Sequence, residues 1–221
     1  MVKEGLPFVI VPALIAMFLA YFQLWWIAAI FVALALFMAY FFRDPFREGP
    51  EGEGLILAAC DGTVTRIDDN EDGKLVSVFM SPMDVHINRS PVSGTVSKVE
   101  YFRGKKNPAT SNTASLTNER NSLTIDADGI SVRCTQIAGI MARRIVCWAK
   151  QGDELKQGEK FGLIKFSSRT DVLMPSNVEI EVKIGDHVKG GETVLARVTL
   201  SVPPVVTGGS EVSQPLGEAL I

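Results

Sequence analysis

One long apolar run occupies the first fifth of the chain. Residues 6–42 contain no Asp, Glu, Lys or Arg. At a rise of about 1.5 Å per residue, a single straight helix over this run would measure about 55 Å, against about 30 Å for the hydrocarbon core of a bilayer. The pattern therefore predicts two shorter helices with a break at residues 21–24, where Gln23 is the strongly polar residue.

Positive charges flank the apolar run on both sides. Lys3 precedes it, and Arg43 and Arg47 follow it. Because lysine and arginine next to membrane segments stay in the cytoplasm, both ends of the run are expected there. The run is also much longer than the apolar core of a cleaved signal peptide. We therefore expect residues 1–45 to form a membrane-associated helical hairpin, either spanning or shallow, that holds the rest of the chain at the cytoplasmic face of the cell membrane.

From residue 55 onward, the chain consists of short alternating runs separated by turn residues. Apolar and polar positions that alternate, with many β-branched side chains, are typical of strands with one buried face. Such runs lie at residues 62–68, 74–81, 94–102, 121–139 and 143–149, with two more strands expected within 178–198. The segment 201–221 is rich in Pro, Gly, Ser and Val and is expected to be a disordered tail.

Two dipeptides in this region are strong hairpin signals. Asp72-Gly73 and Asp128-Gly129 each lie between strand-like runs, where a tight turn needs residues that tolerate positive φ. No strongly amphipathic helix is predicted after residue 50. The sequence therefore predicts a mainly β fold, with an antiparallel, sandwich-like domain over residues 46–200.

Two segments of the β region, 59–64 and 184–195, resemble the turns of lipoyl and biotinyl carrier domains. A carrier of that kind displays a modifiable lysine on a tight turn. Neither a Met-Lys-Met nor an Asp-Lys-Ala trio occurs in this sequence. A membrane-anchored carrier or adaptor module is therefore a second hypothesis, which predicts a modified lysine.

Composition narrows the chemistry further. The net charge of −3 and the pI of about 5.5 do not suggest a nucleic-acid partner. The three cysteines have no metal-ligand spacing and are expected to be reduced thiols, and neither a P-loop nor a dinucleotide fingerprint is found. His86 and His187 are the two histidines, so an imidazole base must be one of them.

A pair of adjacent serines, Ser167 and Ser168, lies in the segment FGLIKFSSRTD at residues 161–171. A serine hydroxyl is a weak nucleophile unless a base takes its proton. If it is held against the preceding carbonyl, it can attack its own backbone and cut the chain. The simpler interpretation is a pair of exposed loop serines.

Four motifs, in order, resemble the short prokaryotic class of the phosphatidylserine decarboxylase family, archaetidylserine decarboxylases included. They are FFRDP at 41–45, CDGTV at 60–64, FMSPMDVHINRSPVSG at 79–94, and QIAGIMARRIVC at 136–147 followed by segment 158–171 with the serine pair. The resemblance covers residues 41–198. It implies a membrane-bound lyase that converts phosphatidylserine to phosphatidylethanolamine and CO2 in phospholipid biosynthesis, with a diacyl or an ether lipid as substrate.

The resemblance also implies that the protein is a zymogen that makes its own cofactor. Ser168 would attack the carbonyl carbon of Ser167, dividing the precursor into an associated β chain, 1–167, and α chain, 168–221. Ser168 would become a covalent pyruvoyl group, that is, a bound pyruvate, which forms a Schiff base with the substrate amine. Glycine is the usual residue at position 167, so serine there is either tolerated or slows or blocks cleavage.

The remaining roles follow from the same resemblance. His86 would be the base, oriented by Asp61, and Arg143 and Arg144 would bind the lipid phosphate. As alternatives, His86 is a structural histidine, Asp61 a turn residue and the arginines a solvated strand end. The resemblance implies no metal, and it is compatible with a homodimer. An uncleaved, inactive relative that binds lipid is a further alternative.

Overall fold

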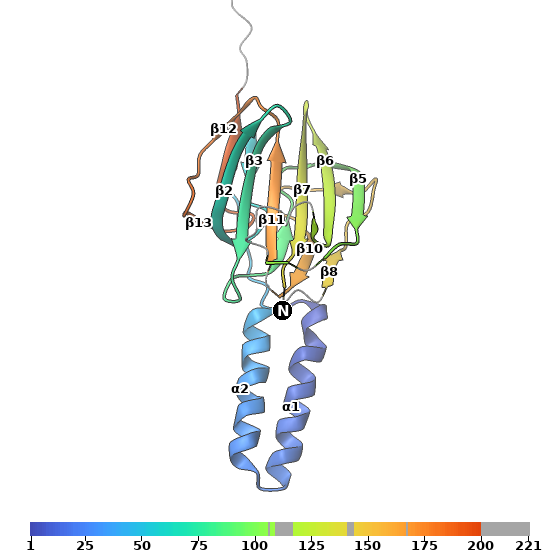
Figure 1. Ribbon diagram of the computed structural model, residues 1–221, viewed down its shortest axis with the longest axis vertical. Helices are drawn as coiled ribbons and strands as arrows, with labels where there is room; N and C mark the ends of the chain where they lie inside the picture. Colours follow the sequence, from blue (N-terminus) through green and yellow to red (C-terminus); the bar gives the residue numbers. More distant parts are fainter. Residues whose placement is uncertain (106, 109–116, 141–143, 167, 200–221) are drawn as a thin grey trace, which may run out of the picture.

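The computed structural model describes residues 1–105, 107–108, 117–140, 144–166 and 168–199. Figure 1 shows two antiparallel helices that lie side by side and project from one end of a β domain. The N-terminus lies where the helices meet the domain. A 3-10 turn, η1 (Lys3–Gly5), leads into α1 (Leu6–Tyr21), which packs along α2 (Trp25–Phe41). The chain reverses at Gln23, whose φ is 59°. The predicted break at residues 21–24 is confirmed.

The length of the helices bears on the membrane prediction. The helical stretch Lys3–Tyr21, with 19 residues, is long and apolar enough to cross a membrane, whereas Trp25–Phe41 is a shorter apolar helix. Most of the large side chains on both helices are exposed, among them Met17, Phe18 and Trp26. A surface of this kind is stable in contact with lipid rather than with water.

The β domain is antiparallel throughout its named pairs, which confirms the predicted mainly β fold. Its strands are β1 (Leu55–Leu57), β2 (Gly62–Asn70), β3 (Gly73–Met80), β4 (Ile87–Arg89), β5 (Gly94–Phe102), β6 (Arg120–Ala127), β7 (Ile130–Ala138), β8 (Arg144–Cys147), β9 (Glu154–Leu155), β10 (Lys160–Lys165), β11 (Ser168–Met174), β12 (Val178–Ile180), β13 (His187–Val188) and β14 (Val194–Val198). They form a large curled sheet in the order β13-β2-β3-β11-β7-β6-β5-β9 and two small sheets, β4-β10-β8 and β1-β14-β12.

Both predicted hairpin signals lie at hairpin turns. Asn70 pairs with Gly73 at the end of β2 and β3, and Ala127 pairs with Ile130 around Asp128-Gly129. Gly129 has a φ of 76°, which a residue without Cβ adopts at little cost. The prediction of two strands within residues 178–198 was wrong, because the structure has three short ones there, β12, β13 and β14.

The core lies between the large sheet and the small sheets. Its fully buried side chains include Val78, Leu123, Ile125, Phe161 and Val172. β11 is the central strand of the large sheet, paired with β3 on one side and β7 on the other. Residues 160–174 were not predicted as strands, although they form the two strands β10 and β11.

A second apolar cluster joins the helices to the β domain. Phe41 and Phe42, at the end of α2, pack with Val85, just before β4, and with Ile87 and Leu163 of the small sheet β4-β10-β8. Polar contacts surround this cluster: the Trp148 indole N–H donates to Glu4 at 2.8 Å, and the Lys160 ammonium donates to Asp44 at 2.7 Å. The base of the hairpin is therefore fixed against the end of the domain that contains Ser168.

Candidate functional site

Ser168 is the first residue of β11, at the point where the chain crosses from the small sheet to the large one. Its backbone lies opposite Met80 of β3 and Ala138 of β7, and the residue is fully buried. The hydroxyl contacts the Met80 sulfur at 3.9 Å, a weak hydrogen bond for a buried oxygen. Ser167, the predicted scissile partner, lies outside the described residues.

Phe166 marks the start of this crossover and has an unusual backbone conformation. Its φ is +67°, a region that costs a bulky residue on the order of 1–3 kcal/mol and is usually maintained by the surrounding structure. Here the Phe166 ring stacks on Phe41, with centroids 4.8 Å apart, and meets Phe42 edge-on at 6.1 Å. The strained residue therefore directly precedes the predicted scissile pair and is held by the base of the hairpin.

His86 lies just before β4 and is 3% exposed. Its Nδ1 is 3.0 Å from the backbone carbonyl of Asp84, and its ring lies 4.2 Å from that of Phe41. Because a carbonyl can only accept, Nδ1 must carry the proton, and in the neutral ring Nε2 then has a free lone pair. Within the described part of the chain, Nε2 is buried and has no hydrogen-bond partner.

The strand contacts bring His86 and Ser168 to the same end of the domain. The Ile164 N–H donates to the His86 carbonyl, four residues before Ser168. Two residues farther along each segment, Asn88 donates to the Thr170 hydroxyl at 2.9 Å. His86, just before β4, and Ser168, the first residue of β11, each lie two residues before a member of this Asn88–Thr170 contact.

A row of buried side-chain amides supports this contact. Asn121 donates to Gln136 at 3.1 Å, and Gln136 donates to Asn88 at 2.8 Å. Gln136 and Asn88 are fully buried, and each is hydrogen-bonded, as buried amides need to be. These bonds fix the small sheet against the large one and so fix the segment that carries His86.

Asp61 has different partners from those that the sequence predicts. Its carboxylate accepts a hydrogen bond from Arg47 at 2.6 Å and another from the Gly190 N–H at 2.8 Å. Within the described residues, no hydrogen bond joins Asp61 to His86. Burial raises the pKa of the Asp61 carboxyl, while the Gly190 N–H and the Arg47 guanidinium act in the opposite direction. The group that orients His86 is the Asp84 carbonyl, and the prediction that Asp61 orients it is corrected.

The structure describes one of the two arginines predicted to bind the lipid phosphate. Arg144 is exposed at the start of β8, and Arg143 is outside the described residues. His187 has a side chain that is 57% exposed, 3.5 Å from the Asp84 carboxylate. Sequence reasoning missed Asp84 and Phe41, although both lie within the motifs SPMDVH and FFRDP that it singled out.

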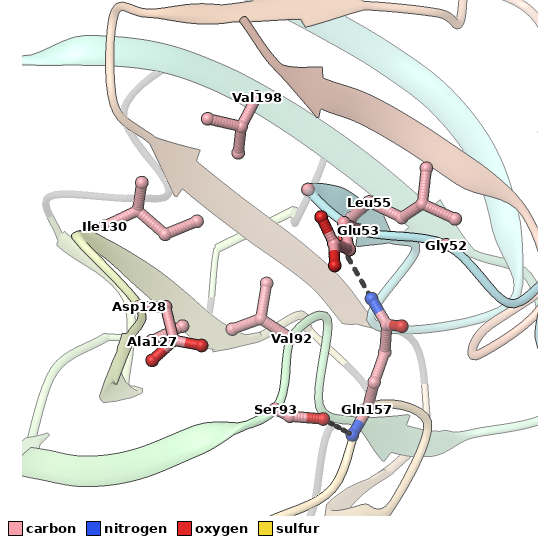
Figure 2. A pocket seen from close by; sticks show the side chains of 11 residues that line it. Gly52, Glu53, Leu55, Val92, Ser93, Ala127, Asp128, Ile130, Gln157 and Val198 are labelled. Atoms are coloured by element: carbon pink, nitrogen blue, oxygen red, sulfur yellow. Dashed lines mark hydrogen bonds between the residues drawn. The ribbon is translucent and has the colours of Figure 1, made fainter. Parts of the chain in front are cut away.

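A separate hollow of about 470 Å³ opens at the other end of the domain. Figure 2 shows Gln157 beside it, with its side chain bonded to the Leu55 carbonyl and its backbone N–H bonded to Ser93. Ile130, which lines this hollow, is eight residues along β7 from the partner of Ser168, or about 27 Å at ~3.4 Å per residue. The hollow is therefore not part of the serine site.

The protonation of His86 predicts how stability depends on pH. Burial lowers the pKa of His86 to about 4, although the Asp84 carbonyl and carboxylate act in the opposite direction. The unfolded chain binds a proton at this residue below about pH 6.5, whereas the folded chain does so only below about pH 4. As the pH falls from about 6.5 to about 4, the free energy of unfolding should therefore fall by on the order of 3 kcal/mol.

Urea unfolding of the full chain in detergent micelles across this range measures the effect. His86→Gln lacks the titrating group and should lose this part of the pH dependence. An unchanged pH dependence in His86→Gln would show that the buried, neutral state of His86 is not its source.

A buried serine and a buried histidine with an unbonded Nε2 thus lie at one end of the described domain. Comparison with known proteins shows which family the chain belongs to. Residues 34–196 match the protein family described as "Phosphatidylserine decarboxylase". The chain belongs to the phosphatidylserine decarboxylase family, and the protein is a decarboxylase.

Three relatives show how far the similarity extends, each named "Phosphatidylserine decarboxylase proenzyme". The chain is 42% identical to the one from Syntrophus aciditrophicus over 87% of this chain and 95% of that protein. It is 44% identical to the one from Symbiobacterium thermophilum, over 89% of this chain and 94% of that protein. It is 45% identical to the one from Cereibacter sphaeroides, over 89% of both.

Proposed function

We propose that this protein converts phosphatidylserine to phosphatidylethanolamine and CO2 at the cytoplasmic face of the cell membrane, with a pyruvoyl group made from Ser168. The observation that carries the proposal is the presence, at the same end of the domain, of a fully buried Ser168 hydroxyl and a buried His86 Nε2 that has no partner in the described part of the chain. That the relatives are named proenzymes supports a processing step. The apolar helices at the serine end of the domain support a lipid substrate.

The proposed processing uses the two serines and His86. His86 Nε2 takes the proton from the Ser168 hydroxyl, whose oxygen attacks the carbonyl carbon of Ser167. The peptide C–N bond breaks and an ester C–O bond forms in its place. Loss of the Cα proton of residue 168 then breaks its Cβ–O bond and releases the Ser167 carboxylate. One water is consumed and one ammonia leaves as residue 168 becomes pyruvoyl.

These surroundings fit a pyruvoyl group at residue 168. The position is buried and apolar on the side of Met80, and the neutral His86 Nε2 is free to move a proton. The pyruvoyl carbonyl supplies an electron sink for the carbanion that remains when CO2 departs. His86 is suited to return a proton to the carbon that lost CO2. Phe41 and Phe166 exclude water from this step.

The sheet pairing predicts that the β and α chains stay together after cleavage. β11 would belong to the α chain, yet it pairs with β3 from Ser168 to Met174 and with β7 from Ser168 to Leu173. A central strand with both edges bonded separates only when the sheet unfolds. The two chains should therefore co-elute in size-exclusion chromatography in detergent and separate only in denaturant. Separation under native conditions would contradict this pairing.

The reaction is tested with the purified full chain and phosphatidylserine in detergent micelles. Conversion to phosphatidylethanolamine with release of CO2 is expected, and a parallel reaction with phosphatidylcholine should give neither. A fully cleaved protein that leaves phosphatidylserine unchanged would refute the proposed substrate. A single intact chain that binds the lipid would instead favour an inactive relative, and a modified lysine would favour a carrier.

A further inference from the structure

We propose that a groove at the base of α1 and α2, together with Lys165, binds the phospholipid substrate, with an acyl chain in the groove and the phosphate at Lys165. The proposal rests on the proposed function for the identity of the headgroup. It assigns the lipid a direction: the chain runs along the hairpin away from the domain, and the headgroup points toward Ser168.

The groove has the size and chemistry for the first part of an acyl chain. Its volume is about 300 Å³, and it is lined by Pro7, Phe8, Val11, Pro12, Leu34 and Met38. All six side chains are apolar, so the groove suits hydrocarbon rather than a polar ligand. From Phe8 to Pro12, α1 rises about 6 Å at ~1.5 Å per residue, which accommodates the carbons nearest the glycerol.

A cation lies at the domain end of the groove. The Lys165 ammonium is 5.3 Å from the centroid of the Phe8 ring, and Phe8 lines the groove. In the β10–β8 pair, Lys165 lies directly opposite Arg144. Like charges at opposed positions of a strand pair are unfavourable. Neither Lys165 nor Arg144 forms an ion pair with any residue that the structure describes. A phosphodiester between them would offset that repulsion.

The cation also lies beside the predicted reaction centre. Lys165 and Phe166 are consecutive, and the Phe166 ring is 5.9 Å from that of Phe8. The groove, the cation and the serine crossover are thus linked through side chains in contact. In Figure 1, α1 starts below the end of the domain that carries β8 and β10, the strands that contain Arg144 and Lys165.

A second hollow of the hairpin provides a contrast. It is larger, at about 840 Å³, and is lined mainly by alanines such as Ala16, Ala28 and Ala35. None of its lining residues is charged. A lipid phosphate would have no partner at that hollow, so the groove beside Phe8 is the one we assign to the substrate.

Photo-crosslinking tests this site without relying on turnover. The probe is phosphatidylserine with a diazirine on an early carbon of one acyl chain, added to the full-length protein in detergent micelles. Peptide mapping should place the crosslinks within residues 7–12 and 34–38. Lys165→Gln should lower the yield at half-saturating lipid by about fivefold to tenfold, the loss expected for one charge-assisted hydrogen bond. Lys165→Arg, which retains the charge, should keep most of the yield.

Two matched controls separate this site from general effects. Lys150→Gln removes a charge from an exposed turn, where the backbone N–H and carbonyl of Lys150 are hydrogen-bonded to Asp153, and should not change the yield. Val11→Trp fills the groove and should abolish the crosslinks, whereas Leu14→Trp, at an exposed position of α1 outside the groove, should not.

The outcomes distinguish this proposal from the proposed function. Crosslinks spread evenly along both helices, or a yield unaffected by both Lys165→Gln and Val11→Trp, would overturn the site even if phosphatidylethanolamine is formed. Crosslinks confined to the groove in a protein that forms no phosphatidylethanolamine would support the site and refute the reaction.

Discussion

Ser168→Ala is expected to leave the precursor as one chain and to reduce decarboxylation to background. Alanine removes the only side-chain atom of residue 168 that can attack the Ser167 carbonyl, and without the resulting ester no elimination can lead to a pyruvoyl group. The Ser168 side chain is buried and has the Met80 sulfur as its partner at 3.9 Å. Its loss should therefore cost little stability, so that the variant folds and the effect is chemical. Gel electrophoresis and conversion of phosphatidylserine measure both parts.

Ser167→Ala shows which of the two serines is the nucleophile. In the proposed mechanism, residue 167 contributes a carbonyl rather than a hydroxyl, so this variant should still be cleaved. Decarboxylation that survives in Ser168→Ala, or cleavage that is lost only in Ser167→Ala, would contradict the assignment of Ser168.

His86→Gln is expected to slow self-cleavage by about 10²- to 10⁴-fold, the usual contribution of a general base. The glutamine amide can still donate to the Asp84 carbonyl, but it has no lone pair that takes a proton near neutral pH. A time course of freshly refolded or freshly translated precursor, followed by gel electrophoresis, gives the rate.

His187→Gln provides the matched histidine control, since that side chain is more than half exposed. It should cleave within about twofold of the unaltered chain, as most surface substitutions have little effect. If His86→Gln cleaves as fast as His187→Gln, the base is a different group and the free Nε2 has no role in processing.

Several parts of this structure could be predicted because single residues disrupt a strong pattern. Gln23 is a polar residue in an otherwise apolar, uncharged run, and the helices do end and begin on either side of it. Asp128-Gly129 has the residue types that a two-residue hairpin needs, and the pairing of Ala127 with Ile130 follows. Ser168 and His86 were found because they lie in recognisable motifs, and the structure brings both to the same end of the domain.

Other parts could not be predicted because their causes are not local. β11 was missed as a strand because it lacks alternation: Arg169 and Asp171 form a buried ion pair at 2.9 Å, so charged positions are buried along with apolar ones. The partner of His86 is a backbone carbonyl, which every residue possesses. The bond from Gly190 to Asp61 joins segments that are distant in the sequence and depends on the folded sheets.

The central claim is that this chain cuts itself before residue 168 and makes a pyruvoyl group there, and intact mass spectrometry of the purified protein under denaturing conditions tests it most directly. The account predicts two species: residues 1–167 with a free carboxyl end, and residues 168–221 with a pyruvoyl group in place of the serine and no free amine. A single species with the mass of all 221 residues after prolonged incubation would contradict it.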